Sequence, residues 1–426
     1  MNKKIFMIFG FLAISLILVQ GEWCFSAEKE PLKIGLISAL SAPYGLSNKV
    51  SMEISVEELN KEGGILGRPV KLIVEDWKRE VPLAVAAYKK LVMSEKCLVV
   101  FTEGTEGTTA CMQEAAKMMQ EFPHLQFAFW TAHDGPTETV CANYEKYKFF
   151  FRVYPKSGDS YDPKLKFWTM FTEVIGTKKL ALLIEDIGWT EPYVNGLPGK
   201  YPPFKDFIEE KGVKVVYQAK SAIGEKMFLP TLEKIAASGA DTIYWITGYT
   251  DTITLAKQWS ESAAKNMDFV AQSGACSYAA FWNMTGGAAL GWVSTWPEVR
   301  IPFTDKSLSF LTELNKRGAG LIASTYGAYD GPWIIKAAVE KAGRINDVGT
   351  LIKALETVEV QRGFWKWKFD KCHDPVKGYP YHPTPLGQFQ ENGKYRAVFS
   401  EEIRKLANPN DGFIHVKELR AKFGQK

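Results

Sequence analysis

The feature that most restricts the fold of this chain is a regular alternation of short apolar runs with segments of helical periodicity. In the first part of the sequence the apolar runs lie at 32–40, 70–76, 97–101 and 127–130, with helical patterns between them at 47–64, 81–93 and 108–121. Gly63 and Gly64 end the first helical pattern, as glycines commonly do at helix C-termini. This alternation predicts a parallel sheet with helices on both faces, joined by right-handed crossovers.

A second series of the same kind follows residue 150. Its apolar runs lie at 179–186, 213–218, 241–247 and 268–273, and its helical patterns at 204–212, 229–239 and 254–265. Two such series predict an α/β fold of two Rossmann-like lobes with parallel-sheet cores and a cleft between them. We expect segments such as "FFFRVYP" (149–155) to cross from one lobe to the other.

Residues 1–27 have the pattern of a secretory signal peptide. Lys3 and Lys4 precede an apolar run at 5–19, and a short segment with small residues follows it. A membrane anchor is the second reading, but the run is shorter than the ~20 residues that a spanning helix needs. Lipidation of Cys24 is disfavoured, because no small residue stands immediately before it. We therefore expect a periplasmic protein whose mature chain begins near residues 26–28.

Charge and composition argue against a nucleic-acid partner. The net charge of +4 is spread along the chain, and the densest basic stretch is "GFWKWKFDKCHDPVK" at 363–377. Its interleaved aromatic residues could stack on unpaired bases, but we interpret the stretch as the solvated face of a strand.

The cysteines and histidines predict no metal site. The sequence has no CxxC or HxxxH pattern, and the adjacent Cys372 and His373 would point to opposite faces of an extended strand. If Cys24 leaves with the signal peptide, the six cysteines become five, which allows up to two disulfides in an oxidising compartment. A pairing of Cys111 with Cys141 fits the order of the strands, although the sequence leaves the connectivity open.

A Gly/Thr/Glu loop at 103–109 is the first candidate for ligand binding. It follows an apolar run and leads into a helical pattern, and parallel sheets bind ligands at the carboxyl ends of their strands, where helix N-termini attract anions. The loop lacks the GxxxxGK[ST] and GxGxxG patterns, and Glu103 and Glu106 would repel a phosphate. A carboxylate suits the loop better. The alternative is that its threonines only cap the helix and its glycines only turn the chain.

Three longer stretches carry a resemblance to a known family. They are "KIGLISALSAPYG" (33–45), "NKEGGILGRPVKLIVED" (60–76) and "VGTLIKALETVEVQRGFWKWKFD" (348–370). Together they resemble the periplasmic solute-binding proteins of the branched-chain amino acid ABC importer family, and the GGILGRPVKL pattern is the most specific part. The resemblance implies a type I periplasmic binding fold, similar to Leu/Ile/Val-binding proteins, with two lobes joined by three hinge crossings. One lobe would hold 28–152 and 298–360, the other 153–297 and 361–426.

The resemblance also implies a function. Such a protein captures a small carboxylate-containing solute, an amino acid or a related or aromatic acid, closes over it and delivers it to the membrane permease of an ABC importer. It needs no cofactor, catalyses no reaction and acts as a monomer. A sensor of the same fold, which passes a signal to a membrane partner, is the alternative function.

Carried over position by position, the resemblance predicts the residues that contact the ligand. They are Tyr44, Glu103, Gly104, Thr105, Thr131 and His133 on the first lobe, and Trp189, Tyr249 and Ser273 on the second. Thr105 takes the position of the hydroxyl that binds the ligand carboxylate, while Trp189 and Tyr249 lie near aromatic positions that cover the ligand.

Ser273 is the main departure from the family pattern. Amino-acid binders of this family carry an acidic residue after the strand that here reads "FVAQSGA", where it pairs with the ligand ammonium. A buried ammonium without a partner is costly, so either another acid such as Glu103, Asp134 or Asp186 replaces it, or the ligand has no ammonium. We interpret Asp330, which stands before Gly331 and Pro332, as a helix cap.

Two enzyme classes lack their motifs in this sequence. A hydrolase with a nucleophile elbow would need GxSxG, and a nicotinamide enzyme would need a glycine-rich turn after the first strand. The final stretch, 401–426, extends beyond what the resemblance explains.

Overall fold

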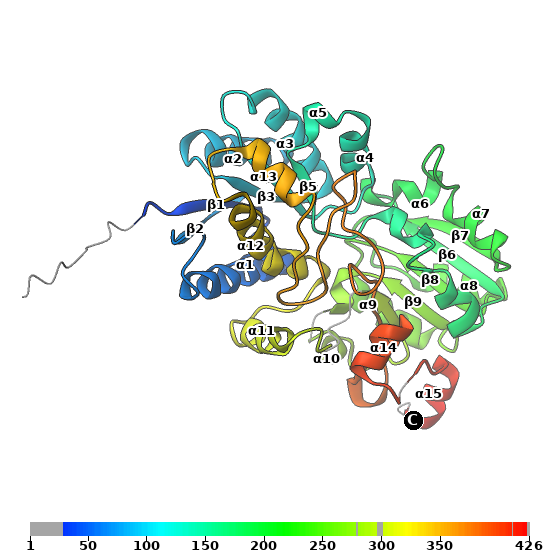
Figure 1. Cartoon of the computed structure of the whole chain (residues 1–426). Coiled ribbons are helices and arrows are strands. Elements are labelled where there is room, and N and C mark those ends of the chain that lie inside the picture. Colours follow the sequence, from blue (N-terminus) through cyan, green and yellow to red (C-terminus); the bar gives the residue numbers. More distant parts are fainter. Residues whose placement is uncertain (1–28, 278–279, 296–300, 411, 424–426) are drawn as a thin grey trace, which may run out of the picture.

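The computed structural model describes residues 29–277, 280–295, 301–410 and 412–423 (Figure 1). The expected signal peptide at 1–27 lies outside these residues. Across the described parts of the chain, every helix is too short or too polar to traverse a lipid bilayer.

The first sheet contains five parallel strands in the order β2-β1-β3-β4-β5. These strands are β1 (Leu32–Ser38), β2 (Val70–Asp76), β3 (Val99–Glu103), β4 (Leu125–Trp130) and β5 (Phe150–Arg152). The helices of this lobe are α1 (Pro43–Lys61), α2 (Val81–Lys89), α3 (Thr105–Met118), α4 (Gly135–Ala142), α5 (Tyr144–Tyr147), α11 (Asp305–Lys316), α12 (Ala323–Ala342) and α13 (Val348–Leu355). Helices α12 and α13 come from late in the chain, yet their apolar side chains are buried in the same core as the first four strands (Figure 1).

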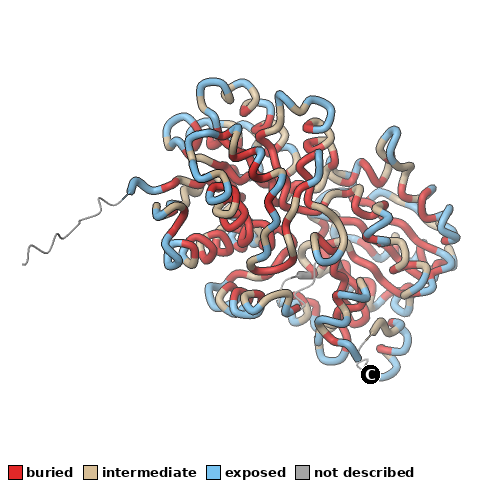
Figure 2. Tube along the Cα trace, in the orientation of Figure 1, coloured by how far each residue is buried: buried red, intermediate tan, exposed pale blue. Residues whose placement is uncertain are grey.

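The second sheet contains seven strands in the order β12-β11-β10-β9-β8-β6-β7. Its parallel strands are β6 (Lys179–Glu185), β7 (Lys214–Ser221), β8 (Thr242–Ile246), β9 (Asp268–Gln272) and β10 (Val293–Thr295), and β11 (Leu386–Phe389) and β12 (Tyr395–Phe399) are added antiparallel at one edge. The helices of this lobe are α6 (Glu191–Asn195), α7 (Phe204–Glu210), α8 (Leu229–Ala237), α9 (Thr252–Glu261), α10 (Phe281–Thr285), α14 (Glu401–Ala407) and α15 (Val416–Phe423). Figure 2 shows that the central strands of both lobes are buried, whereas exposed residues lie mainly on the outer helices and loops. The edge strands β2 and β7 are only partly buried.

This architecture confirms the predicted fold of two α/β lobes with parallel-dominated sheets. The element order makes the chain pass between the lobes three times: after β5, between β10 and α11, and between α13 and β11. The core of the first sheet also includes four aromatic residues that follow position 360, namely Phe364, Trp365, Trp367 and Phe369. The exact lobe boundaries stay a prediction.

The basic aromatic stretch at 363–377 is therefore not a solvated strand face, and that interpretation was wrong. Phe364, Trp365 and Trp367 are each about 1% exposed. The side chain of Asp330 is part of the same packing, because it accepts hydrogen bonds from the indole of Trp367 (2.8 Å) and the backbone N–H of Gly363 (2.8 Å). Asp330 lies inside α12 and is fully buried, so it is not the helix cap that we expected.

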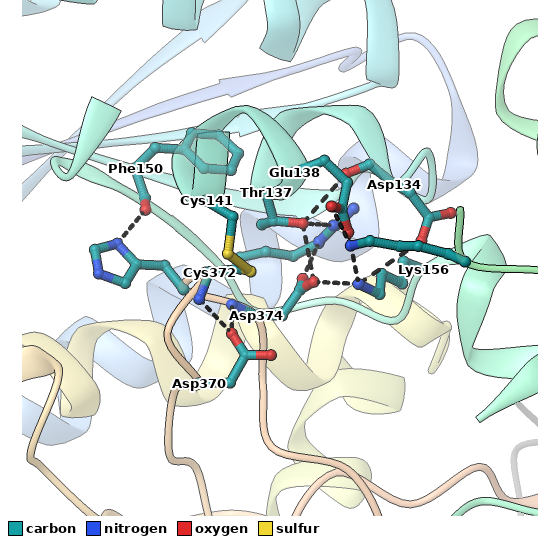
Figure 3. Close-up of a disulfide and its surroundings, with 12 residues drawn as sticks. Asp134, Thr137, Glu138, Cys141, Phe150, Lys156, Asp370, Cys372 and Asp374 are labelled. Atoms are coloured by element: carbon teal, nitrogen blue, oxygen red, sulfur yellow. Dashed lines mark hydrogen bonds and ion pairs between the residues drawn. A yellow bond between two sulfur atoms is a disulfide. The ribbon is translucent and has the colours of Figure 1, made fainter. Parts of the chain in front are cut away.

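The disulfide joins Cys141 of α4 to Cys372, 231 residues later, and Cys111 is a free buried thiol (Figure 3). The pairing of Cys111 with Cys141 that strand order allowed was wrong. Sequence order could not indicate the correct pair, because Cys372 reaches α4 only when the segment between α13 and β11 packs against the first lobe before it crosses to the second. The disulfide thus attaches this crossing to the first lobe.

Candidate functional site

A cavity lies between the lobes, at the carboxyl ends of β3, β4, β6, β8 and β9. Its volume is about 1010 Å³, including the part open to solvent. The first lobe contributes Gly104, Thr105, Glu106, Trp130 and Ala132; the first crossing contributes Tyr154, Lys156, Ser157, Asp159 and Ser160; the second lobe contributes Trp189, Tyr193, Thr247, Tyr249, Gln272 and Ser273. Residues of both lobes and of a crossing between them therefore meet in one space.

The N-terminus of α3 forms one wall of the cavity. The helix begins at Thr105, three residues before the predicted start at 108, and no side chain caps its first N–H groups. Its N-cap is Gly104, whose φ of 76° favours glycine, and a Cβ at this position would lie 2.7 Å from the ring of Trp77. Among the described residues, no hydrogen bond occupies the Thr105 hydroxyl. Uncapped N–H groups and a free hydroxyl at a helix N-terminus suit a carboxylate.

Five of the nine residues predicted from the sequence line this cavity: Gly104, Thr105, Trp189, Tyr249 and Ser273. Trp189 lies in a short 3-10 turn, Gly188–Thr190, that follows β6. Its ring meets the ring of Tyr193 edge to face, with the ring centres 6.3 Å apart. Tyr249 follows β8, and the guanidinium of Arg79 from the first lobe lies 3.8 Å from the centre of its ring. Whether these residues contact a ligand stays a prediction.

Glu103 lies behind the cavity wall instead of in the lining. Its side chain is buried (2% exposed) and accepts hydrogen bonds from the Ser38 hydroxyl (2.6 Å), the Ala39 N–H (2.5 Å), the Asn48 amide (3.0 Å) and the Trp77 indole (3.0 Å). Burial raises the pKa of Glu103, and the four hydrogen bonds oppose that shift. The carboxylate therefore ties the loops after β1 and β2 to β3.

Tyr44, Thr131 and His133 also lie outside the lining. Tyr44 stacks on Trp130, a lining residue, with ring centres 5.3 Å apart. The Thr131 hydroxyl is buried and donates to that of Thr108 (2.9 Å). His133 Nδ1 accepts from the Gly135 N–H (2.8 Å), and its Nε2 lies 3.5 Å from Glu191 of the second lobe. In the structure these side chains support or border the cavity.

A buried cluster of charged residues lies at the crossings, near the disulfide (Figure 3), and its member Lys156 also lines the cavity. Arg152 donates to Asp374 Oδ1 (2.6 Å), and the ammonium of Lys156, a lining residue, donates to Asp374 Oδ2 (2.7 Å). Burial opposes ionisation of Asp374, but the charges of Arg152, Lys156 and Lys377 outweigh it and hold its pKa well below the usual range. The cluster thus joins the first and third crossings and positions Lys156.

Asp159 is a lining residue that the sequence interpretation missed. It lies in the 3-10 turn Ser157–Tyr161, on the first crossing shortly after the end of β5. The residue is 6% exposed. Its Oδ2 accepts from the Lys377 ammonium (2.8 Å) and from the backbone N–H of Lys156 (3.0 Å). Asp159 lies four residues beyond the segment at 149–155 that we expected to cross between the lobes, and nothing in its local sequence distinguishes it from a solvated aspartate.

Gln272, at the end of β9, is another lining residue that the sequence interpretation missed. Its side-chain oxygen accepts from the hydroxyls of Tyr244 (2.5 Å) and Tyr193 (3.2 Å), and the Tyr193 hydroxyl lies 2.8 Å from that of Ser160. The adjacent Ser273 is 4% exposed. In the described parts of the chain, no three His, Cys, Asp or Glu residues are grouped closely enough to hold a metal ion.

Comparisons with known proteins agree on one family. The profile of the family described as periplasmic binding protein matches residues 31–394. The chain is 24% identical over 335 residues to Leu/Ile/Val-binding protein homolog 3 of Brucella melitensis biotype 1, covering 78% of this chain and 84% of that one. Among solved structures it resembles a branched-chain amino acid ABC transporter from Silicibacter pomeroyi (TM-score 0.75, 18% identity, 90% and 99% covered). It also resembles an ABC transporter solute binding protein from R. palustris in complex with benzoate (TM-score 0.69, 19% identity, 88% and 99% covered).

Proposed function

The chain belongs to the periplasmic binding protein family, and from this premise we propose that it is the substrate-binding component of an ABC importer. It captures a small carboxylate-containing solute between its lobes and delivers it to the permease subunits in the membrane. Residues 1–27 direct its export to the periplasm. The named relatives, a Leu/Ile/Val-binding protein and a benzoate complex, support a solute from the amino acids or the aromatic acids.

The cavity is the observation that carries this proposal. Its lining comes from strand ends of both lobes, so a solute held there touches both at once. Thr105 and the first N–H groups of α3 bind the carboxylate, because they are uncapped donors at a helix N-terminus in the lining. Trp189 and Tyr249 cover the remainder of the solute from the second lobe.

Contacts between the lobes explain how the protein closes. The Tyr201 hydroxyl donates to Asp134 (2.8 Å), His133 Nε2 lies 3.5 Å from Glu191, and Arg79 lies over Tyr249. These contacts are individually small, so they hold the closed form only together with the solute. A solute can shift the equilibrium between the open and closed forms only as far as the difference between its affinities for these two forms allows.

Binding by the mature chain from residue 28, purified free of solute, tests the proposal. Thermal unfolding is followed with amino acids, their deaminated acids and aromatic acids. A solute at a hundred times its Kd stabilises by about 2.7 kcal/mol and raises the Tm by a few degrees. Small-angle scattering with the solute that raises the Tm should show a more compact particle. If no carboxylate in the panel shifts the Tm, or if binding leaves the scattering unchanged, the proposal fails.

A further inference from the structure

The three acids that the sequence offered as partners for a ligand ammonium do not line the cavity. Glu103 already accepts four hydrogen bonds. Asp134 Oδ2 accepts from the Tyr201 hydroxyl (2.8 Å) and the Gly158 N–H (3.1 Å). Asp186 is exposed and pairs with Lys220 (2.8 Å). None of these carboxylates can meet a solute in the cavity.

Asp159 differs from all three, because it lines the cavity and one of its oxygens has no partner. Oδ2 is occupied by Lys377 and by a backbone N–H, but within the described residues Oδ1 is buried and accepts no hydrogen bond. A buried acceptor left without a donor costs free energy, and buried polar atoms in folded proteins nearly always have partners. A donor group on the solute would supply that partner if it reached this buried oxygen when the lobes close.

The charges of the lining favour a donor that is cationic. Among the described lining residues, the acidic side chains are Glu106 and Asp159, and the basic side chain is Lys156. The Lys156 ammonium is already committed, since it lies 2.7 Å from Asp374 and 3.7 Å from Asp134. Asp159 is likewise paired, with Lys377 at 2.8 Å, so Glu106 is the lining carboxylate without an ion pair among the described residues. Its charge disfavours a solute with two carboxylates and favours one that brings a positive group.

The aromatic lining is compatible with such a group. Trp130, Tyr154, Trp189 and Tyr193 surround the same space as Asp159. Aromatic faces attract cations as well as apolar groups, so the same rings accommodate an ammonium and the hydrocarbon part beside it.

We propose that the solute is a zwitterion, an amino acid whose ammonium donates to Asp159 Oδ1 while its carboxylate binds at the N-terminus of α3. Asp159, on the first crossing, thereby takes over the role that the serine at 273 cannot fill. This inference rests on the proposed function and narrows its range of solutes, because it excludes benzoate-like acids as the preferred class.

Calorimetry with matched pairs of acids tests the inference on the unmodified mature chain. The pairs are leucine and 4-methylpentanoate, phenylalanine and 3-phenylpropanoate, γ-aminobutyrate and butyrate, and 4-(aminomethyl)benzoate and 4-methylbenzoate. In at least one pair, we expect the ammonium-bearing acid to bind at least about tenfold more tightly than the acid without the ammonium. We expect no acid without an ammonium to bind more tightly than that ligand. If the deaminated acids bind as well or better, this inference is overturned while the proposed function stands. If no member of any pair binds, both are overturned.

The variant Asp159→Asn distinguishes recognition from a structural role. The amide oxygen of asparagine can still accept from Lys377, but its charge is gone. We expect affinity for the amino acid to fall at least about tenfold while affinity for the deaminated partner stays within about twofold, so that the preference collapses. A loss shared equally by both ligands would indicate a structural role and overturn the inference. Asp186→Asn, which removes an exposed carboxylate outside the cavity, serves as the matched control and should leave both affinities unchanged. If Asp159→Asn does not fold, the matched pairs on the unmodified chain decide.

Discussion

Replacing Thr105 by valine removes one hydroxyl from the cavity wall and changes little else. Thr105 is the first residue of α3, and none of the described residues hydrogen-bonds to its hydroxyl, so valine preserves the shape of the side chain without breaking a bond inside the protein. If the hydroxyl donates to the solute carboxylate, the variant loses a hydrogen bond to a charged group, worth about 1.5–3 kcal/mol. The Kd should therefore rise roughly 10- to 150-fold.

Calorimetry with the solute found in the panel measures this change, and thermal unfolding without solute checks the fold. We expect the free energy of unfolding of the ligand-free variant to stay within about 0.5 kcal/mol of the unmodified protein. Thr109→Val is the matched control, because its hydroxyl donates to the Thr105 carbonyl (2.7 Å) one turn further along the same helix and outside the cavity. A Kd for Thr105→Val within twofold of the original, or an equal loss in Thr109→Val, would refute the carboxylate site.

Three further predictions concern the fold and the closure. Replacing Cys141 and Cys372 by serine should lower the free energy of unfolding by about 2–4 kcal/mol in urea titrations, and an unchanged midpoint would show that the crossing needs no covalent attachment. Burial raises the pKa of Asp330 to about 7, so the folded protein holds a proton there that the unfolded chain has released, and stability should fall as pH rises from about 4 to 7. Asp330→Asn should flatten that fall; an unaltered slope would contradict the assignment. Arg79→Ala should raise the Kd about two- to fivefold through loss of its contact with Tyr249, seen as faster solute release in stopped-flow experiments, and an unchanged release rate would contradict it.

The sequence determined the architecture because that information is local. Apolar runs of strand length alternating with helical patterns predicted two parallel-dominated sheets, and both are present. The same reasoning placed the loop of Gly104 and Thr105 at a strand end, whereas Trp189, Tyr249 and Ser273 were predicted from the family resemblance. All five residues line the cavity. A loop at the carboxyl end of a parallel strand must face the same edge as its neighbours, whatever its side chains do.

Only the tertiary structure decided what the individual polar side chains do. Glu103 and Asp159 are both acids near strand ends or crossings, yet one is saturated by donors from three other segments and the other leaves an oxygen without a partner beside the cavity. Cys372 reaches Cys141, and Trp367 reaches Asp330, across separations that no local pattern spans. The sequence by itself specified secondary structure and its order, because periodicity acts over a few residues. Burial and hydrogen bonding depend on segments far apart in the chain, so the role of each charged group was determined when the lobes and crossings packed together.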